Sequence, residues 1–190
     1  MNFASSRTPN LGLLGEQLVA QWLQSQDWII LHHRWRCRWG EIDLIAQLGE
    51  MGRGGDLGVG GVGEISSFPS YGSTLAFVEV KTRGKGNWDA DGLLAITPAK
   101  QAKLWQTAAL FLAERPDFAS LPCRFDVALV NSMRLPQRWR DDDTNASDSS
   151  LATSNVIQLP AVQLGQPVFV AGYQLILQDY LVSAFDIQEG

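Results

Sequence analysis

The chain has 190 residues, of which 45% are apolar and 18% are charged, as is typical of one water-soluble globular domain. Seven Trp and eight Phe residues supply core material, which excludes a chain that is disordered throughout. Fifteen Lys and Arg residues stand against twenty Asp and Glu residues, and the net charge of −5 argues against a simple basic nucleic-acid binder. The acidity is concentrated, because residues 132–190 hold 3 basic and 7 acidic residues.

We expect a cytoplasmic protein that does not contact a membrane. No apolar run approaches the roughly 20 residues that a membrane span needs. The first ten residues, MNFASSRTPN, lack the apolar core of a secretory signal. The two cysteines, Cys37 and Cys123, are too few for a disulfide framework or a zinc site.

The first predicted element is a helix over residues 11–26. Leu14 and Leu18 lie one turn apart on its buried face, and Asn10 precedes the helix as an N-cap. A strand over residues 28–38 is predicted next. Because side chains alternate along a strand, one face would carry Ile29, Leu31, His33, Trp35 and Cys37, and the other Ile30, His32, Arg34, Arg36 and Arg38.

Two further strands are predicted at residues 41–48 and 75–82, where apolar and polar side chains alternate. Nine of the 18 glycines lie between them, in residues 49–74, so these strands would form a hairpin closed by a Gly-rich insertion loop. A phosphate-cradling loop is the alternative for this stretch, but it contains no GxxxxGK motif.

The second helix would begin at Thr97 and Pro98, an N-cap followed by proline at the first helical position. It would end at Arg115, which precedes another proline. The apolar spacing predicts that its buried face consists of Ala102, Trp105, Ala109 and Leu112.

Two more strands are predicted at residues 123–130 and 168–177. Between them, residues 141–155 are acidic and rich in Ser and Thr, as is typical of a flexible, solvated linker. The order of elements predicts an α/β fold with an αβββαβ core, in a single domain that spans residues 1–190.

Three charged residues, Asp43, Glu79 and Lys81, occupy strand positions at which charge is disfavoured. Glu79 and Lys81 are two residues apart and project from one face, and Asp43 would lie beside Glu79 if their strands pair. The two carboxylates and the Val80 carbonyl would suit Mg²⁺ or Mn²⁺, and Lys81 would orient water or contact a phosphate. A cross-strand salt bridge on a solvated sheet face is the alternative.

Glu16, on the first helix, is a further candidate. The residues three and four positions away, which share its face, are small or apolar: Gly12, Leu13, Val19 and Ala20. In one interpretation Glu16 is a third carboxylate that reaches the metal directly or through water. In the other it is a first-turn acid that the helix macrodipole favours.

Four strings carry a resemblance to a known family: Gly15-Glu16, Gly40-Glu41-Ile42-Asp43-Leu44-Ile45-Ala46, Phe77-Val78-Glu79-Val80-Lys81-Thr82-Arg83 and Arg124-Phe125-Asp126-Val127. In this order they resemble the YraN-like family of predicted endonucleases. That family is similar to archaeal Holliday-junction resolvases, in the PD-(D/E)xK restriction-endonuclease-like superfamily. The resemblance implies a restriction-endonuclease-like core with a mixed sheet flanked by helices. It also implies a catalytic trio with an auxiliary acid, namely Asp43, Glu79 and Lys81 with Glu16, whereas a structural role is the alternative for Glu41.

The resemblance further implies a metal-dependent nuclease that hydrolyses DNA phosphodiesters, with branched or single-stranded DNA as the expected partner. Resolvase relatives act as dimers because a four-way junction has two-fold symmetry, so a homodimer is compatible with this resemblance. Members of the family are largely uncharacterised. A non-catalytic nucleic-acid-binding or assembly module that retains the fold is therefore the alternative, and the acidic linker favours it.

Basic side chains near the catalytic trio would contact DNA phosphates, which gives sequence-independent and salt-sensitive binding. Without the Gly-rich stretch, residues 1–131 hold 11 basic and 10 acidic residues. Trp88 would stack on an exposed base, or else pack on the core. For the arginines of the first strand, a solvated edge that resists aggregation is the alternative. The predicted nucleic-acid contacts are Arg34, Arg36, Arg38, Arg83, Lys85, Trp88, Lys100 and Lys103.

Overall fold

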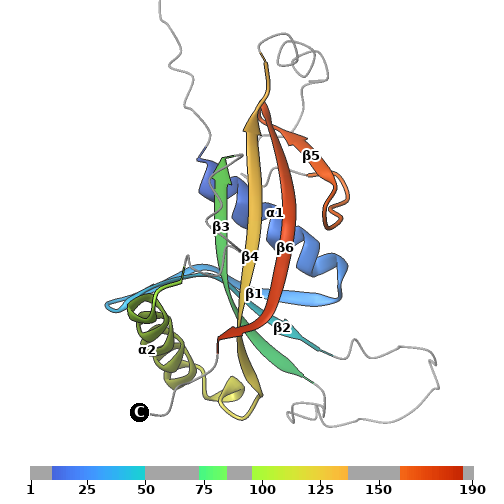
Figure 1. Cartoon of the computed structure of the whole chain (residues 1–190). Helices are drawn as coiled ribbons and strands as arrows, with labels where there is room; N and C mark the ends of the chain where they lie inside the picture. Colours follow the sequence, from blue (N-terminus) through green and yellow to red (C-terminus); the bar gives the residue numbers. More distant parts are fainter. Residues whose placement is uncertain (1–9, 50–72, 85–95, 137–158, 186–190) are drawn as a thin grey trace, which may run out of the picture. The chain divides into compact units, whose positions relative to one another are not determined.

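The computed structural model describes residues 10–49, 73–84, 96–136 and 159–185. Their elements are, in chain order, α1 (Leu11–Ser25), β1 (Trp28–Cys37), β2 (Gly40–Leu48), β3 (Thr74–Gly84), α2 (Pro98–Glu114), the 3₁₀ turn η2 (Pro116–Phe118), β4 (Cys123–Arg134), β5 (Pro167–Val170) and β6 (Tyr173–Phe185). The strands form one mixed sheet in the order β1-β2-β3-β4-β6-β5 (Figure 1). The α/β fold class is thereby confirmed, and the elements up to β4 follow the predicted order.

The chain divides into two compact units, each assembled from segments that are distant in the sequence. One unit contains β1, β2, the first half of β3, α2, η2, the start of β4 and the end of β6. The other contains α1, the second half of β3, the rest of β4, β5 and most of β6. The predicted linker at 141–155 lies outside the described residues, as does the Gly-rich stretch except for residues 49, 73 and 74.

In the first unit, antiparallel β1, β2 and β3 form a sheet that carries α2. A cluster of aromatic rings fills the space between them, with Phe111 of α2 at its centre. The ring centroid of Phe111 lies 5.5 Å from those of His32 and Trp35 and 6.0 Å from that of Phe77, with edge-to-face geometry in each case. Such aromatic pairs contribute about 0.5–1.5 kcal/mol beyond the burial of their area.

This cluster also determines which face of α2 is buried. The helix begins as predicted, because the Thr97 hydroxyl accepts a hydrogen bond from the Lys100 N–H at 3.3 Å. The predicted buried face is wrong: Ala102 and Ala109 are exposed. A helix with many alanines offers more than one apolar stripe, and the large Phe111 ring selects the stripe that packs best. The buried residues are Leu104, Thr107, Ala108 and Phe111.

Strict alternation of side chains fails along β1. Ile30 pairs with Ala46 and His32 pairs with Ile45, so Leu31 is an extra residue in a β-bulge. Further along, Arg34 adopts a left-handed conformation with a φ of 51°. His32 and Trp35, predicted on opposite faces, consequently both contact Phe111.

The predicted strand at 168–177 proves to be a hairpin of two strands. β5 and β6 are antiparallel, with pairs that run from Val170–Tyr173 next to the turn to Pro167–Ile176. Ala171 and Gly172 form the turn between them. Both turn residues have positive φ, of 49° and 77°, as two-residue hairpin loops commonly require. An apolar run spans both strands, so its hydrophobicity alone does not reveal the turn.

In the second unit, α1 packs closely against β3. Asn10 caps the helix as predicted, since its side-chain oxygen accepts hydrogen bonds from the N–H groups of Gly12 and Leu13 at 3.1 and 3.4 Å. Among the described residues, neither helix is long and apolar enough to cross a membrane. The approach of α1 to β3 is closest at Gly15, where a Cβ atom would lie 1.9 Å from the Thr82 Oγ1.

We expect Gly15→Ala to lower the free energy of unfolding by about 2 kcal/mol, as measured by urea denaturation. Overpacking costs about 1–3 kcal/mol, and a 1.9 Å approach outweighs the roughly 1 kcal/mol that alanine gains over glycine within a helix. The double variant with Thr82→Ala should recover most of the loss, because it removes the clashing hydroxyl. A stabilised single variant would contradict this packing.

Candidate functional site

The register of β2 against β3 brings the predicted carboxylates together. The two strands pair from Leu48 with Thr74 to Leu44 with Val78, and the next residues along them are Asp43 and Glu79. Directly opposed residues of an antiparallel pair project from the same face. Continued by one residue, this register sets Asp43 across from Glu79 on the neighbouring strand, as the sequence predicts for paired strands.

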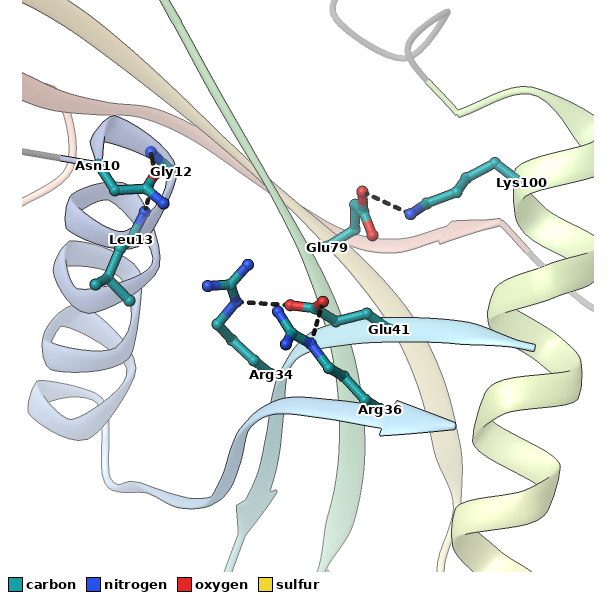
Figure 2. Close-up of polar contacts among 8 residues, drawn as sticks. All are labelled: Asn10, Gly12, Leu13, Arg34, Arg36, Glu41, Glu79 and Lys100. Carbon is teal, nitrogen blue, oxygen red and sulfur yellow. Dashed lines mark hydrogen bonds and ion pairs between the residues drawn. The ribbon is translucent and has the colours of Figure 1, made fainter. Parts of the chain in front are cut away.

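Glu79 is a buried carboxylate, with only 4% of its surface exposed. It lies two residues after Phe77, on the same face of the strand, and the Phe77 ring contacts Phe111 of α2, so Glu79 lies on the α2-facing side of β3. The ammonium group of Lys100, in the first turn of α2, lies 3.3 Å from the Glu79 Oε1 (Figure 2). Lys100, which we predicted to contact DNA, thus forms an ion pair with this carboxylate.

Lys81 and Val80 follow Glu79 on the same strand, and both are half-buried. Lys81 is two residues beyond Glu79, so the pleat of β3 directs both side chains to one face. In the second unit, Glu16 of α1 is buried, with 6% of its surface exposed. Glu16 and Lys81 each adjoin a residue of the Gly15–Thr82 packing contact, which holds α1 against the end of β3.

The arginines of β1 form a fork around Glu41. The Nε groups of Arg34 and Arg36 each donate a hydrogen bond to a different oxygen of this carboxylate, both at 2.6 Å (Figure 2). His33 pairs with Leu44 and Trp35 pairs with Ile42, so Arg34 of β1 lies opposite Asp43 of β2. Arg34 therefore lies in a cross-strand row with Asp43 and Glu79.

The pKa of Glu41 reflects these contacts. Partial burial raises it, but the hydrogen bonds and charges of Arg36 and Arg34 outweigh burial and hold the pKa below its usual value. Glu41 stays ionised and neutralises part of the arginine charge. This arrangement agrees with the structural alternative for Glu41, although the same arginines still carry an excess of positive charge.

Asp126 of β4 is a charged residue to which sequence reasoning assigned no role. It is fully buried and accepts a hydrogen bond from the Arg124 Nε at 3.0 Å and another from the Ser183 N–H at 2.9 Å. Strand alternation could have predicted its pairing with Arg124, two residues away. No signal in the sequence indicates Ser183, which is 57 residues away and has a left-handed φ of 49°.

The remaining predicted DNA contacts are scattered. Lys103 is exposed on α2, and Arg83, near the end of β3, accepts a hydrogen bond from the Ser132 hydroxyl through its carbonyl at 3.0 Å. Arg38 is exposed in the turn between β1 and β2, where its guanidinium lies 4.9 Å from the Trp39 ring centroid. Lys85 and Trp88 lie outside the described residues.

The donor set bears on the choice of metal. Within residues 10–49, 73–84, 96–136 and 159–185, no three His, Cys, Asp or Glu side chains are grouped to hold an ion. Zinc, which takes three or four such ligands, is therefore a poor match for the candidate site. Magnesium commonly takes one or two carboxylates and completes its shell with water and substrate oxygens, which Asp43 and Glu79 would suit.

Comparisons with known proteins identify the family. The model of the "Uncharacterised protein family UPF0102" matches residues 15–130, which include all the residues of the predicted catalytic site. The chain belongs to the UPF0102 family. A UPF0102 protein of Acaryochloris marina is 46% identical over 182 residues, which cover 96% of this chain and 93% of that protein.

Other UPF0102 proteins match over similar lengths. That of Trichodesmium erythraeum is 43% identical and covers 96% of this chain and 92% of its own length. That of Synechocystis is 41% identical, with coverage of 93% and 97%. The expected YraN-like family membership is thereby confirmed, while the names of these relatives state no activity.

We expect Glu41→Gln to lower the free energy of unfolding by about 1 kcal/mol at neutral pH, since partly exposed ion pairs contribute no more than this. The folded-state pKa of Glu41 is lowered, so its stabilisation is present above the usual value of 4.5 and is lost as the pH falls through the folded-state pKa. Urea denaturation of both proteins across this range measures the difference.

The exposed Glu114, at the end of α2, provides the matched control. Glu114→Gln should leave the unfolding free energy nearly unchanged. A difference between wild type and Glu41→Gln that persists undiminished at about pH 3 would show that the ion pairs with Arg34 and Arg36 are not its cause.

Proposed function

We propose that this UPF0102 protein is a metal-dependent nuclease-like protein that hydrolyses DNA phosphodiesters, with branched DNA as the substrate to test first. One observation carries the proposal: the β2–β3 register that makes Asp43 and Glu79 neighbours, with Lys81 two residues further along β3. The order α1-β1-β2-β3-α2-β4 supports a restriction-endonuclease-like core as the framework of this site.

The proposed metal is Mg²⁺ or Mn²⁺, held by the carboxylates of Asp43 and Glu79 and the carbonyl of Val80. Glu16 assists, directly or through water. When bound, such an ion stabilises charge that develops on a phosphate and lowers the pKa of water. Oxygen donors of this kind are the ligands that hard divalent cations prefer.

The chain's own residues then bind and orient the reactants. Lys81 holds the attacking water or a phosphate oxygen by its ammonium group, which acts as a compact point charge. Lys100, 3.3 Å from Glu79, balances the negative charge of this buried carboxylate when no cation is bound. Arg34, across the strand from Asp43, attracts a DNA phosphate toward the same row.

The second candidate function is a nucleic-acid-binding or assembly module with an idle site. It is favoured by the ion pairs of Glu79 with Lys100 and of Glu41 with Arg34 and Arg36, which satisfy these charges within the protein. A buried carboxylate beside a second one nevertheless serves no evident purpose in a pure DNA binder, because both repel phosphate. We therefore place catalysis first.

We expect purified protein to cleave four-way, flap, duplex or single-stranded DNA with Mg²⁺ or Mn²⁺, and to lose this activity in EDTA. Asp43→Ala and Lys81→Ala should each slow cleavage at least about 100-fold, because each removes a group that binds or orients the reactants. Gel-based rates on each substrate measure this, and titration with Mn²⁺ should detect weaker metal binding in Asp43→Ala.

Asp117→Asn is the matched control, since this exposed aspartate of η2 pairs only locally with Arg115. It should cleave and bind Mn²⁺ like wild type. Cleavage that persists in both Asp43→Ala and Lys81→Ala would exclude the proposed site. Binding of DNA without cleavage under every metal would favour the non-catalytic module.

We expect DNA binding to be weak in EDTA and to fall steeply between about 50 and 200 mM salt, because arginine contacts with phosphates release counterions. Arg38→Ala should reduce the slope of log affinity against log salt by about 1, whereas Arg115→Ala should not change it. Fluorescence anisotropy with a labelled oligonucleotide measures both. Tight binding in EDTA at physiological salt would contradict this account of the acidic chain.

A further inference from the structure

The turn between β1 and β2 presents a tryptophan to solvent. Cys37 pairs with Gly40, so the turn consists of only two residues, Arg38 and Trp39. Both are exposed, and 43% of the surface of Trp39 remains accessible. Trp39 is the exposed tryptophan of the β1–β2 hairpin, at the end opposite to the exposed Ile29.

This turn is anchored rather than loosely attached. The Cys37 sulfur accepts a hydrogen bond from the Trp39 N–H at 3.3 Å, and its thiol donates one to the Thr107 Oγ1 of α2, with a sulfur–oxygen distance of 3.8 Å. Thr107 is fully buried and donates in turn to the Lys103 carbonyl at 2.7 Å. Figure 1 shows the end of the hairpin beside α2, so the backbone that carries Trp39 is held against the helix.

The surroundings of Trp39 are cationic. The Arg38 guanidinium lies over the ring, 4.9 Å from its centroid, which is a cation–π distance. Arg36, two residues before Arg38, has 62% of its side chain exposed. A flat aromatic ring with the Arg38 guanidinium over it combines a surface for stacking with a cation for a phosphate.

From this we propose that Trp39, with Arg38, is a stacking platform for an unpaired nucleobase. The inference rests on the proposed action on DNA, and it specifies that the DNA recognised has single-stranded or opened bases. Every nucleobase has an aromatic face, so stacking of this kind is independent of sequence. The neighbouring arginines would hold the phosphate backbone on either side of the stacked base.

Other partners match this surface less well. A stable protein interface buries about 800 Å² per partner around an apolar centre, whereas Trp39 is a single ring among charged side chains. Insertion into a lipid surface also requires an apolar face of several residues. A surface of one rigid aromatic ring beside cations matches the size of one base and its phosphates.

The test uses the full chain in EDTA at about 50 mM salt, so that DNA is bound without being cleaved. The probes are a single-stranded oligonucleotide that contains 2-aminopurine and the blunt duplex of the same sequence. We expect Trp39→Ala to weaken single-strand binding about tenfold and to abolish the quenching of 2-aminopurine fluorescence. Duplex affinity should change less than about twofold.

Two further variants separate stacking from size and from folding. Trp39→Phe should keep most of the affinity and quenching, whereas Trp39→Leu, which retains apolar bulk without an aromatic ring, should behave like Trp39→Ala. Ile29→Ala is the matched control for an exposed apolar residue of the same hairpin and should bind like wild type. Thermal unfolding midpoints of all variants establish that they are folded.

Each outcome decides the inference. Unchanged single-strand binding in Trp39→Ala, or equal losses on single strand and duplex, would overturn the stacking platform while the proposed DNA binding stands. Single-strand affinity and 2-aminopurine quenching of Trp39→Leu equal to those of wild type would overturn it as well. If wild type binds neither DNA, the stacking platform is wrong, and the proposed function is wrong as well if no DNA is cleaved with Mg²⁺ or Mn²⁺.

Discussion

The register between β2 and β3 is the constraint on which the candidate site depends. Ile42, Leu44, Ile45 and Ala46 are all fully buried, so β2 is covered on both faces and a slip of one residue would move every side chain to the wrong face. Hydrophobic burial on β2 thus fixes the position of Asp43 opposite Glu79. The chemistry of the site follows from a packing requirement of the apolar residues around it.

Charge within this sheet is compensated by neighbouring elements. Glu79 pairs with Lys100 of α2, and Glu41 pairs with two arginines of β1. Asp126 binds Arg124 and the backbone of Ser183. A buried carboxylate without such partners would be strongly destabilising, so these contacts stabilise the fold whether or not a metal binds. The net charge of −5 therefore says little about the surface around the site.

The hairpin of β1 and β2 carries both the arginines that pair with Glu41 and the surface that we propose binds nucleic acid. Arg34 lies beside Asp43, Arg36 follows on the strand, and Arg38 and Trp39 form the turn. The hairpin thus carries Arg34 and Asp43 of the cross-strand row, together with the ring that we propose stacks on an unpaired base. Its bulge at Leu31 and the left-handed Arg34 let His32 and Trp35 pack on Phe111 while the arginines reach Glu41.

The sequence by itself determined the elements from α1 to β4, the caps at Asn10 and Thr97, the unusual strand carboxylates and the family, since these depend on periodicity, local hydrogen bonds and motif order. Tertiary structure decided the buried face of α2, the bulge in β1, the turn at Ala171 and Gly172, and the partners of Glu79 and Asp126. The physical reason is that alternation predicts the face of a side chain but not what lies opposite. That partner is set by packing between segments distant in the sequence, such as Phe111 on β1 and β3.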